Sequence, residues 1–147
     1  MYKHILLPVD DSELSARAEK ECLAFAKSMG SKVTALHVFP HHGVAVDEGM
    51  TSDAFRKLQD DNDAVVRKSA EDMLARLQAR ARTEGVECGS VVAPGDEPFR
   101  EIVEHAQRLG CDLIVMASQR RGGLEGLLHG SETARVIAHC RLAILVV

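Results

Sequence analysis

Aromatic side chains are scarce in this chain, which has four Phe, one Tyr and no Trp among 147 residues. A protein that stacks the bases of single-stranded nucleic acid needs a platform of aromatic rings, and this composition argues against one. The formal net charge of −4 also argues against a general nucleic-acid binder, whose surface is rich in Lys and Arg. We therefore expect no nucleic-acid partner.

Long hydrophobic runs are missing as well. No apolar run approaches the roughly 18 residues that a membrane span needs. The N-terminal stretch MYKHILLPVDDS has a short apolar run, but carboxylates follow at once and no signal-peptide cleavage pattern comes after them. We expect a cytoplasmic protein without a membrane partner.

Metal-binding patterns of cysteine and histidine are also missing. The four cysteines form no C-x-x-C, and no Cys/His spacing fits a zinc site; they are Cys22, Cys88, Cys111 and Cys140. In a reducing compartment we expect free thiols that mostly serve in packing. His41 and His42 lie near Asp47 and Glu48, but adjacent histidines in a loop seldom converge on one ion. The sequence therefore predicts no metal site.

Short apolar runs alternate with helical patterns along the whole chain. The runs are typical of buried strands, and they cover His4–Val9, Lys32–Phe39, Val86–Ala93, Leu113–Met116 and Leu142–Val147. Three helical patterns begin after the capping residues Ser12, Asp96 and Ser131, and one begins at Ser52. Glycines end the first three, at Gly30, Gly85 and Gly110. We expect one Rossmann-like α/β domain over residues 1–147, an open parallel five-stranded sheet of order 3-2-1-4-5 with helices on both faces.

The second helical pattern is the longest, from Ser52 to about Thr83. Its apolar residues recur at helical spacing and form a stripe, through Phe55, Leu58, Val65, Val66, Ala70, Met73, Leu74 and Leu77. Asp and Glu lead its early turns and Arg its last turn, which suits the helix dipole.

The stretch from Cys111 to Thr133 carries the strongest functional signal. Its strand is followed by a Gly-rich, basic loop and then by Ser131 as a helix cap, so the N–H groups of that helix would point back at the loop. This arrangement suits an anion such as phosphate. In a sheet of order 3-2-1-4-5 the ligand crevice lies where the order reverses, between Pro8–Asp10 after the first strand and Met116–Ala117 after the fourth.

At these residues the chain resembles the universal stress protein family from end to end. KHILLPVDDSELS is similar to the family's opening ILVPVDGS, ALHV to its second strand, and APGDEP to its turn before the third helix. The last 36 residues, from DLIVMASQ to LAILVV, resemble its C-terminal signature. The resemblance implies the fold shared with adenine nucleotide alpha hydrolases.

The resemblance also implies a set of binding residues. The family's adenine and ribose contacts fall on Pro8, Val9, Asp10, Val38 and Met116, and its pocket turn on Gly95. Its ATP-binding members share G-x2-G-x9-G-[ST], whose positions here are Ala117, Arg120, Gly130 and Ser131. The last two match and suggest a phosphate cradle, whereas Arg120 stands where glycine serves a positive φ or close backbone approach. Arg120 and Arg121 can pair with phosphate, while Asp11 and Glu132 add negative charge beside a triphosphate.

Each of these positions also has a plain structural interpretation. Val38 and Met116 suit a packed core, Asp10 and Gly95 suit turns, and Gly130–Ser131 suits an ordinary helix cap. His37, inside a strand, is better explained as a hydrogen-bonded structural residue. No nucleophile and base show a recognisable pairing, because nothing orients His129 beside Ser131.

The resemblance implies a homodimer that binds ATP, with Mg²⁺, or AMP, and that acts as a stress-response module. Without a paired nucleophile and base, we expect no efficient catalysis beyond slow hydrolysis. The dimer contact would be the apolar strand Leu142–Val147, whose edge natural proteins usually cover. A second hypothesis is a member that holds no nucleotide and acts as a dimeric interaction or signalling protein; Ala117 and Arg120 favour it. A third is an alpha-hydrolase-like enzyme, which would need an added substrate domain or a Ser-Gly-Gly type loop where this chain has Asp10–Ser12.

Overall fold

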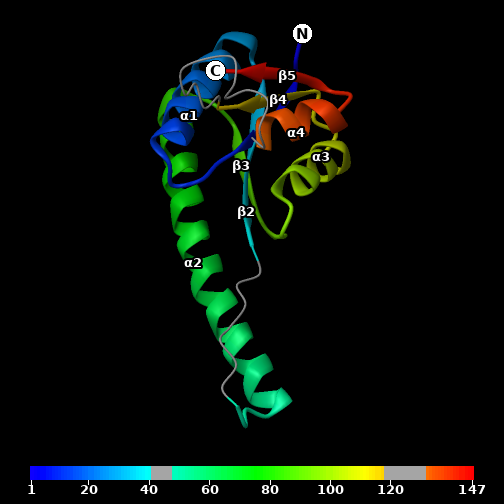
Figure 1. Ribbon diagram of the computed structural model, residues 1–147. Helices are drawn as coiled ribbons and strands as arrows, with labels where there is room; N and C mark the ends of the chain where they lie inside the picture. Colours follow the sequence, from blue (N-terminus) through cyan, green and yellow to red (C-terminus); the bar gives the residue numbers. More distant parts are fainter. Residues whose placement is uncertain (41–47, 118–131) are drawn as a thin grey trace.

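The computed structural model describes residues 1–40, 48–117 and 132–147. Five parallel strands form one sheet in the order β3-β2-β1-β4-β5, with helices between them along the chain (Figure 1). The strands are β1 (His4–Pro8), β2 (Lys32–Phe39), β3 (Cys88–Pro94), β4 (Leu113–Met116) and β5 (Ala143–Val146). The helices are α1 (Glu13–Met29), α2 (Ser52–Glu84), α3 (Pro98–Arg108) and α4 (Glu132–His139). The predicted sheet order and fold class are confirmed.

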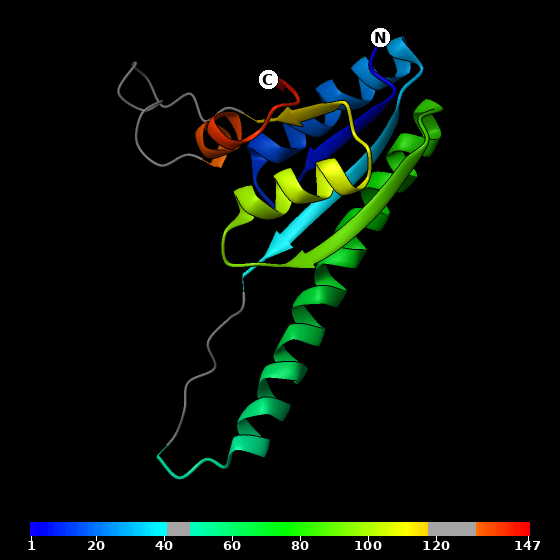
Figure 2. The same cartoon turned by 90° about the vertical axis from the view of Figure 1, so that its right-hand side faces the viewer.

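Helices cover both faces of the sheet (Figure 2). A hydrophobic layer lies between the helices and the sheet on each face. Successive side chains of a strand point to opposite faces, so β1 sends Ile5 and Leu7 to the layer of α1 and α2, and Leu6 to the layer of α3 and α4. All three side chains are fully buried. A strand covered on both faces shows a continuous apolar run rather than alternation, which is why β1 and β4 were visible in the sequence.

The strand boundaries agree with the sequence for β2 and β4 and differ by one or two residues for the other three strands. β2 and β4 have the predicted limits, β1 ends one residue early, and β5 is one residue shorter at each end. β3 begins two residues after the predicted Val86. The Val86 N–H donates to the Ala81 carbonyl at the end of α2, 2.9 Å away, so its backbone pairs with the helix terminus, while its side chain is buried in the layer of α1 and α2.

The predicted helix starts are partly right. The Ser12 side chain caps α1 by accepting from the Ser15 N–H at 3.1 Å, as predicted. α2 begins at Ser52, as predicted, with Thr51 in the cap position. The prediction that Asp96 caps the third helix is wrong, because α3 begins at Pro98 with Glu97 in the cap position and no side-chain cap bond from it.

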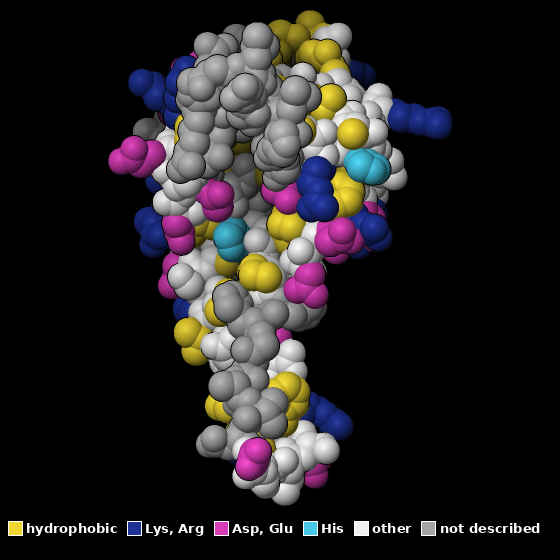
Figure 3. Space-filling model, in the orientation of Figure 1, with side chains coloured by type: hydrophobic (Ala, Val, Ile, Leu, Met, Phe, Trp, Pro, Cys, Tyr) yellow, Lys and Arg dark blue, Asp and Glu magenta, His cyan; other side chains and the backbone are white. Residues whose placement is uncertain are grey.

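The long helix α2 extends beyond the sheet (Figure 1). Its 33 residues span about 50 Å at 1.5 Å per residue. The buried residues begin at Ala70, while Leu58 and Val65 are 42% and 70% exposed. Hydrophobic side chains therefore reach the surface on the outer part of α2 (Figure 3). The stripe read from the sequence packs on the sheet only in its second half. In the described parts of the chain, no helix is long and apolar enough to cross a membrane.

The helices α1 and α2 are joined by an ion pair as well as by packing. Arg80 of α2 donates to the Glu19 carboxylate of α1. The Glu19 side chain is 10% exposed and the Arg80 side chain 52% exposed. A carboxylate this buried requires a partner, so the pair fixes how the two helices lie against each other.

The cysteines are free, with Cys22 and Cys111 buried and Cys88 and Cys140 half-buried. Burial raises the pKa of the Cys22 thiol to about 12 and the pKa values of Cys88 and Cys111 to about 11. Thiols with such pKa values stay protonated at neutral pH and are poor nucleophiles. The expectation of packing thiols is confirmed for Cys22 and Cys111.

Candidate functional site

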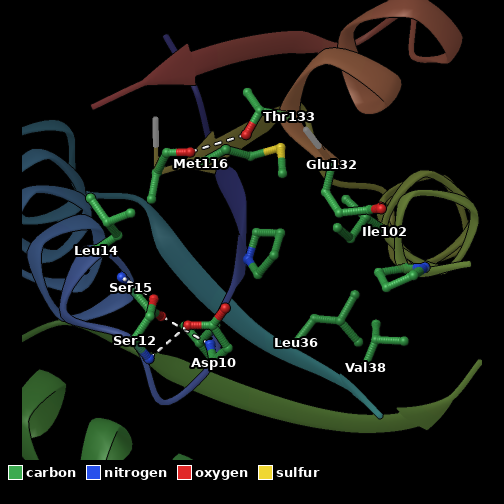
Figure 4. Close-up of a pocket in the computed structure, with 14 residues that line it drawn as sticks. Asp10, Ser12, Leu14, Ser15, Leu36, Val38, Ile102, Met116, Glu132 and Thr133 are labelled. Carbon is green, nitrogen blue, oxygen red and sulfur yellow. Dashed lines mark hydrogen bonds between the residues drawn. The ribbon is translucent and has the colours of Figure 1, made fainter. Parts of the chain in front are cut away.

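A cavity of about 420 Å³ opens at the carboxyl ends of β1, β2 and β4 (Figure 4). It lies between β1 and β4, where the strand order reverses, which is where the sequence predicts a ligand crevice. Its walls come from the strand ends and from the first turns of α1, α3 and α4. The site therefore combines segments that lie far apart in the sequence.

One wall of the cavity is apolar. It is formed by Leu36 and Val38 of β2, Ile102 of α3 and Met116 of β4. Leu36, Ile102 and Met116 also belong to the hydrophobic layer under α3 and α4, so the wall is a continuation of the core. A wall of this kind accepts a flat apolar group such as an aromatic ring.

The side of the cavity next to α1 carries a carboxylate held by hydrogen bonds. The Val9 N–H donates to the Leu36 carbonyl at 2.9 Å, which extends the pairing of β1 by one residue and places Asp10 at the rim. The Asp10 Oδ1 accepts from the Ser12 N–H at 2.8 Å, and the Asp10 N–H donates to the Ser15 Oγ at 2.9 Å. The Asp10 carboxylate is exposed and fixed, and can accept hydrogen bonds from a ligand.

A second carboxylate lies on the opposite side of the cavity, at the start of α4 (Figure 4). The Glu132 Oε2 accepts from the Phe99 N–H at 2.8 Å, and Oε1 lies 3.4 Å from Nη1 of Arg135. Next to it, the Thr133 hydroxyl donates to the Ala117 carbonyl at 3.0 Å. These contacts tie the start of α4 to α3 and to the end of β4.

His37 has the structural role expected of it. Its Nδ1 lies 2.8 Å from the Val9 carbonyl, so Nδ1 carries the hydrogen and donates it. The bond supports the backbone immediately before Asp10. His37 is not among the described residues that line the cavity.

The structure brings together most of the predicted site residues that it describes. Seven of them line the cavity: Pro8, Val9, Asp10, Val38, Met116, Ala117 and Glu132. Gly95 does not line it; its N–H donates to the Phe39 carbonyl at 2.9 Å, and a Cβ there would lie 2.6 Å from Cγ of Glu101. Gly95 is therefore explained by close packing on α3. Arg120, Arg121, Gly130 and Ser131 lie outside the described residues.

Sequence reasoning missed several residues that line the cavity. They are Ser12, Leu14, Ser15, Leu36, Pro98, Ile102 and Thr133. Ser15 had a visible signal, because it lies three residues after the cap Ser12 and so on the same side of the first turn. Pro98 and Ile102 had none, since only the packing of α3 on the sheet places them here.

The described residues include no group of three or more His, Cys, Asp or Glu side chains that could hold a metal ion. The loop histidines His41 and His42 lie outside the described residues.

A profile of the universal stress protein family matches residues 1–147. The chain belongs to this family. It is 31% identical over its full length to the universal stress protein MJ0531 of Methanocaldococcus jannaschii, covering 82% of that protein. It is also 28% identical to the universal stress protein YxiE of Bacillus subtilis, over 100% of this chain and 99% of that one.

Solved structures show the same fold. The chain matches the structure of MJ0577 from M. jannaschii with a TM-score of 0.81 and 27% identity, covering 100% of this chain and 96% of that one. It matches a universal stress protein in complex with cAMP with a TM-score of 0.73, 19% identity, and coverage of 99% and 96%. A complex of the Archaeoglobus fulgidus protein with dAMP gives a TM-score of 0.66, 20% identity, and coverage of 99% and 97%. At these last two identities the likeness is one of fold.

Proposed function

We propose that the cavity binds an adenine nucleotide, AMP or ATP, and that the protein is a nucleotide-binding module of a stress response. The observation that carries the proposal is the apolar wall of Leu36, Val38 and Met116 beside the fixed, exposed carboxylate of Asp10. A purine ring packs on an apolar wall, and ribose hydroxyls donate to a carboxylate. The adenine ligands of the two related structures support the same ligand class.

The remaining predicted residues have roles in this proposal. Pro8, Val9 and Ala117 supply backbone at the strand ends, where it can approach the ligand closely. For the phosphate groups we keep the predicted cradle of Gly130 and Ser131, with Arg120 and Arg121 as cationic partners. ATP would arrive as its Mg²⁺ complex.

We also propose that the protein is not an efficient enzyme. Both hydroxyls on the α1 side of the cavity already accept backbone N–H groups: Ser12 from the Ser15 N–H, and Ser15 from the Asp10 N–H. No histidine is among the described residues that line the cavity, so no imidazole lies there to take a proton from either hydroxyl. Slow hydrolysis of a bound nucleotide is compatible with this arrangement.

The first test identifies the ligand and measures its affinity. Freshly purified protein is denatured, the released small molecules are identified by mass spectrometry, and stripped protein is titrated with AMP and ATP by calorimetry. Asp10→Asn keeps the oxygen that accepts from the Ser12 N–H but removes the charge, and should weaken binding about fivefold through loss of a charged hydrogen bond. Asp11→Asn makes the same charge change one residue away and should not weaken binding, because Asp11 is not among the residues that line the cavity.

No released nucleotide and no heat at millimolar concentrations would contradict nucleotide binding. The second candidate function would then apply, a dimeric interaction protein whose cavity holds no nucleotide. One observation favours it, the Glu132 carboxylate in the cavity wall.

For either function we propose a homodimer formed along β5. In the described sheet β5 lies at the edge, beside β4, and Val146 on β5 is 41% exposed. Ile137 of α4 is 53% exposed. Light scattering after gel filtration should show a dimer for the natural chain and a monomer for Val146→Lys, while Val65→Lys on the outer part of α2 serves as the control. A Val146→Lys protein that stays dimeric would place the contact elsewhere.

A further inference from the structure

Two helices begin at one carboxylate in the cavity wall. Glu132 is the first residue of α4, and its Oε2 accepts from the N–H of Phe99, the second residue of α3. Pro98, the first residue of α3, has no N–H, and Glu97 makes no side-chain cap bond. Glu132 therefore supplies from another helix the cap that α3 lacks in its own sequence.

The electrostatic consequence is a weaker attraction for anions at the starts of these two helices. The first turn of a helix carries about half a positive charge, which attracts phosphate and carboxylate groups. Here Glu132 already compensates the starts of α3 and α4. Among the described residues that line the cavity, the charged side chains are Asp10 and Glu132, both acidic. Arg135 offsets Glu132 in part, at 3.4 Å.

Resting on the function proposed above, we propose that Glu132 is a specificity-determining residue that makes the cavity select adenine ligands of low negative charge, monophosphates over triphosphates. When the ring of a ligand lies on Leu36 and Val38 and its sugar lies at Asp10, its phosphate groups lie on the side of the cavity formed by Glu132 and Thr133 (Figure 4). Each further phosphate then brings like charge toward the Glu132 carboxylate. The loss of binding free energy through this repulsion rises with the charge of the ligand and does not depend on its base or sugar.

Glu132→Gln tests this directly. The glutamine oxygen can still accept from the Phe99 N–H, so the cap remains and only the charge is removed. Glu104→Gln is the matched control, since Glu104 is an exposed glutamate of α3 that is not among the residues lining the cavity. The dissociation constants of AMP and of ATP without Mg²⁺ are measured by calorimetry for the three proteins at low salt.

We expect the ratio of the ATP dissociation constant to the AMP dissociation constant to fall about tenfold in Glu132→Gln. ATP carries about two more negative charges than AMP, and at a solvated site their repulsion by one carboxylate corresponds to a factor of about this size. The ratio should stay unchanged in Glu104→Gln. Adding Mg²⁺ neutralises part of the triphosphate, so it should lower the ratio more in the natural protein than in Glu132→Gln. Together these results would support the assignment.

An unchanged ratio in Glu132→Gln, with both nucleotides bound, would overturn the inference and leave the proposed function standing. An equal fall in Glu104→Gln would also overturn it, because the effect would then follow net charge and not position. Absence of binding of either nucleotide to all three proteins would overturn the proposed function itself.

Discussion

Val136 holds α4, and with it one side of the cavity, against the sheet. It is fully buried, it is the buried residue of that helix, and it packs in the layer that contains Leu6 and Ile114. Val136→Ala removes two methyl groups, worth about 1.6 kcal/mol of transfer free energy. The remaining space adds about 1 kcal/mol, and the better helix propensity of Ala returns about 0.5 kcal/mol. The free energy of unfolding should fall by about 2 kcal/mol, which lowers Tm by roughly 6 °C for a domain of this size.

Urea denaturation followed by circular dichroism measures this loss, and Val65→Ala is the matched control. It makes the same chemical change within a helix, but Val65 is 70% exposed, so the free energy of unfolding should stay within about 0.5 kcal/mol of its value. AMP affinity should fall together with stability in Val136→Ala, since α4 also supplies Thr133 to the wall of the cavity. A loss below about 0.5 kcal/mol for Val136→Ala would refute the reasoning, because α4 would then be held by something other than this contact.

Three further predictions concern stability, each measured as the urea midpoint. Burial, and then the nearby charge of Lys32, lower the pKa of His4. As the pH falls, the unfolded chain therefore takes up a proton at His4 before the folded chain does, so the free energy of unfolding should decline below about pH 6.5. The decline should be smaller in His4→Gln. A midpoint independent of pH from 7.5 to 5.5 would contradict this. Arg80→Leu leaves the buried Glu19 carboxylate unpaired and should lower the free energy of unfolding by about 1–2 kcal/mol. Much of this stability should return in the double variant with Glu19→Gln. If no stability returns, the unpaired charge is not the cause of the loss. Ser12→Ala removes the α1 cap and should cost about 1 kcal/mol, so an unchanged midpoint would mean that water replaces the hydroxyl.

The fold was predictable because its central strands are covered on both faces. Such strands show as uninterrupted apolar runs, and β2 and β4 were placed with their observed limits. The predictions failed at positions where an apolar residue does not belong to a strand or to a helix that packs on the sheet. Val86 is buried, but its N–H bonds to the end of α2. The outer stripe of α2, with Leu58 and Val65, has the periodicity of a packed helix without a sheet beneath it. Periodicity reports which face of a helix is apolar, not how far the neighbouring layer extends.

Only the site residues at the carboxyl ends of the strands could be predicted from the sequence. Asp10 and Met116 were found because the carboxyl ends of neighbouring parallel strands must meet. Ile102 could not be found, since its place depends on how α3 packs. Glu132 was recognised as a charge near the ligand, but its bond to the Phe99 N–H joins residues 33 positions apart and leaves no sequence pattern.

The shape of α2 means that the outer turns of this helix can open at a lower free energy than global unfolding requires. From residue 52 to residue 69 the helix contributes no buried side chain, so its hydrogen bonds there are supported mainly by helix propensity. Opening of those turns exposes little apolar surface, whereas opening of the turns from Ala70 onward breaks the core under the sheet. Amide hydrogens of the outer turns should therefore exchange with solvent through local opening, and those of the inner turns only through global unfolding. Part of the helical signal would then melt ahead of the sheet, and a two-state fit to that signal alone would understate the stability of the domain.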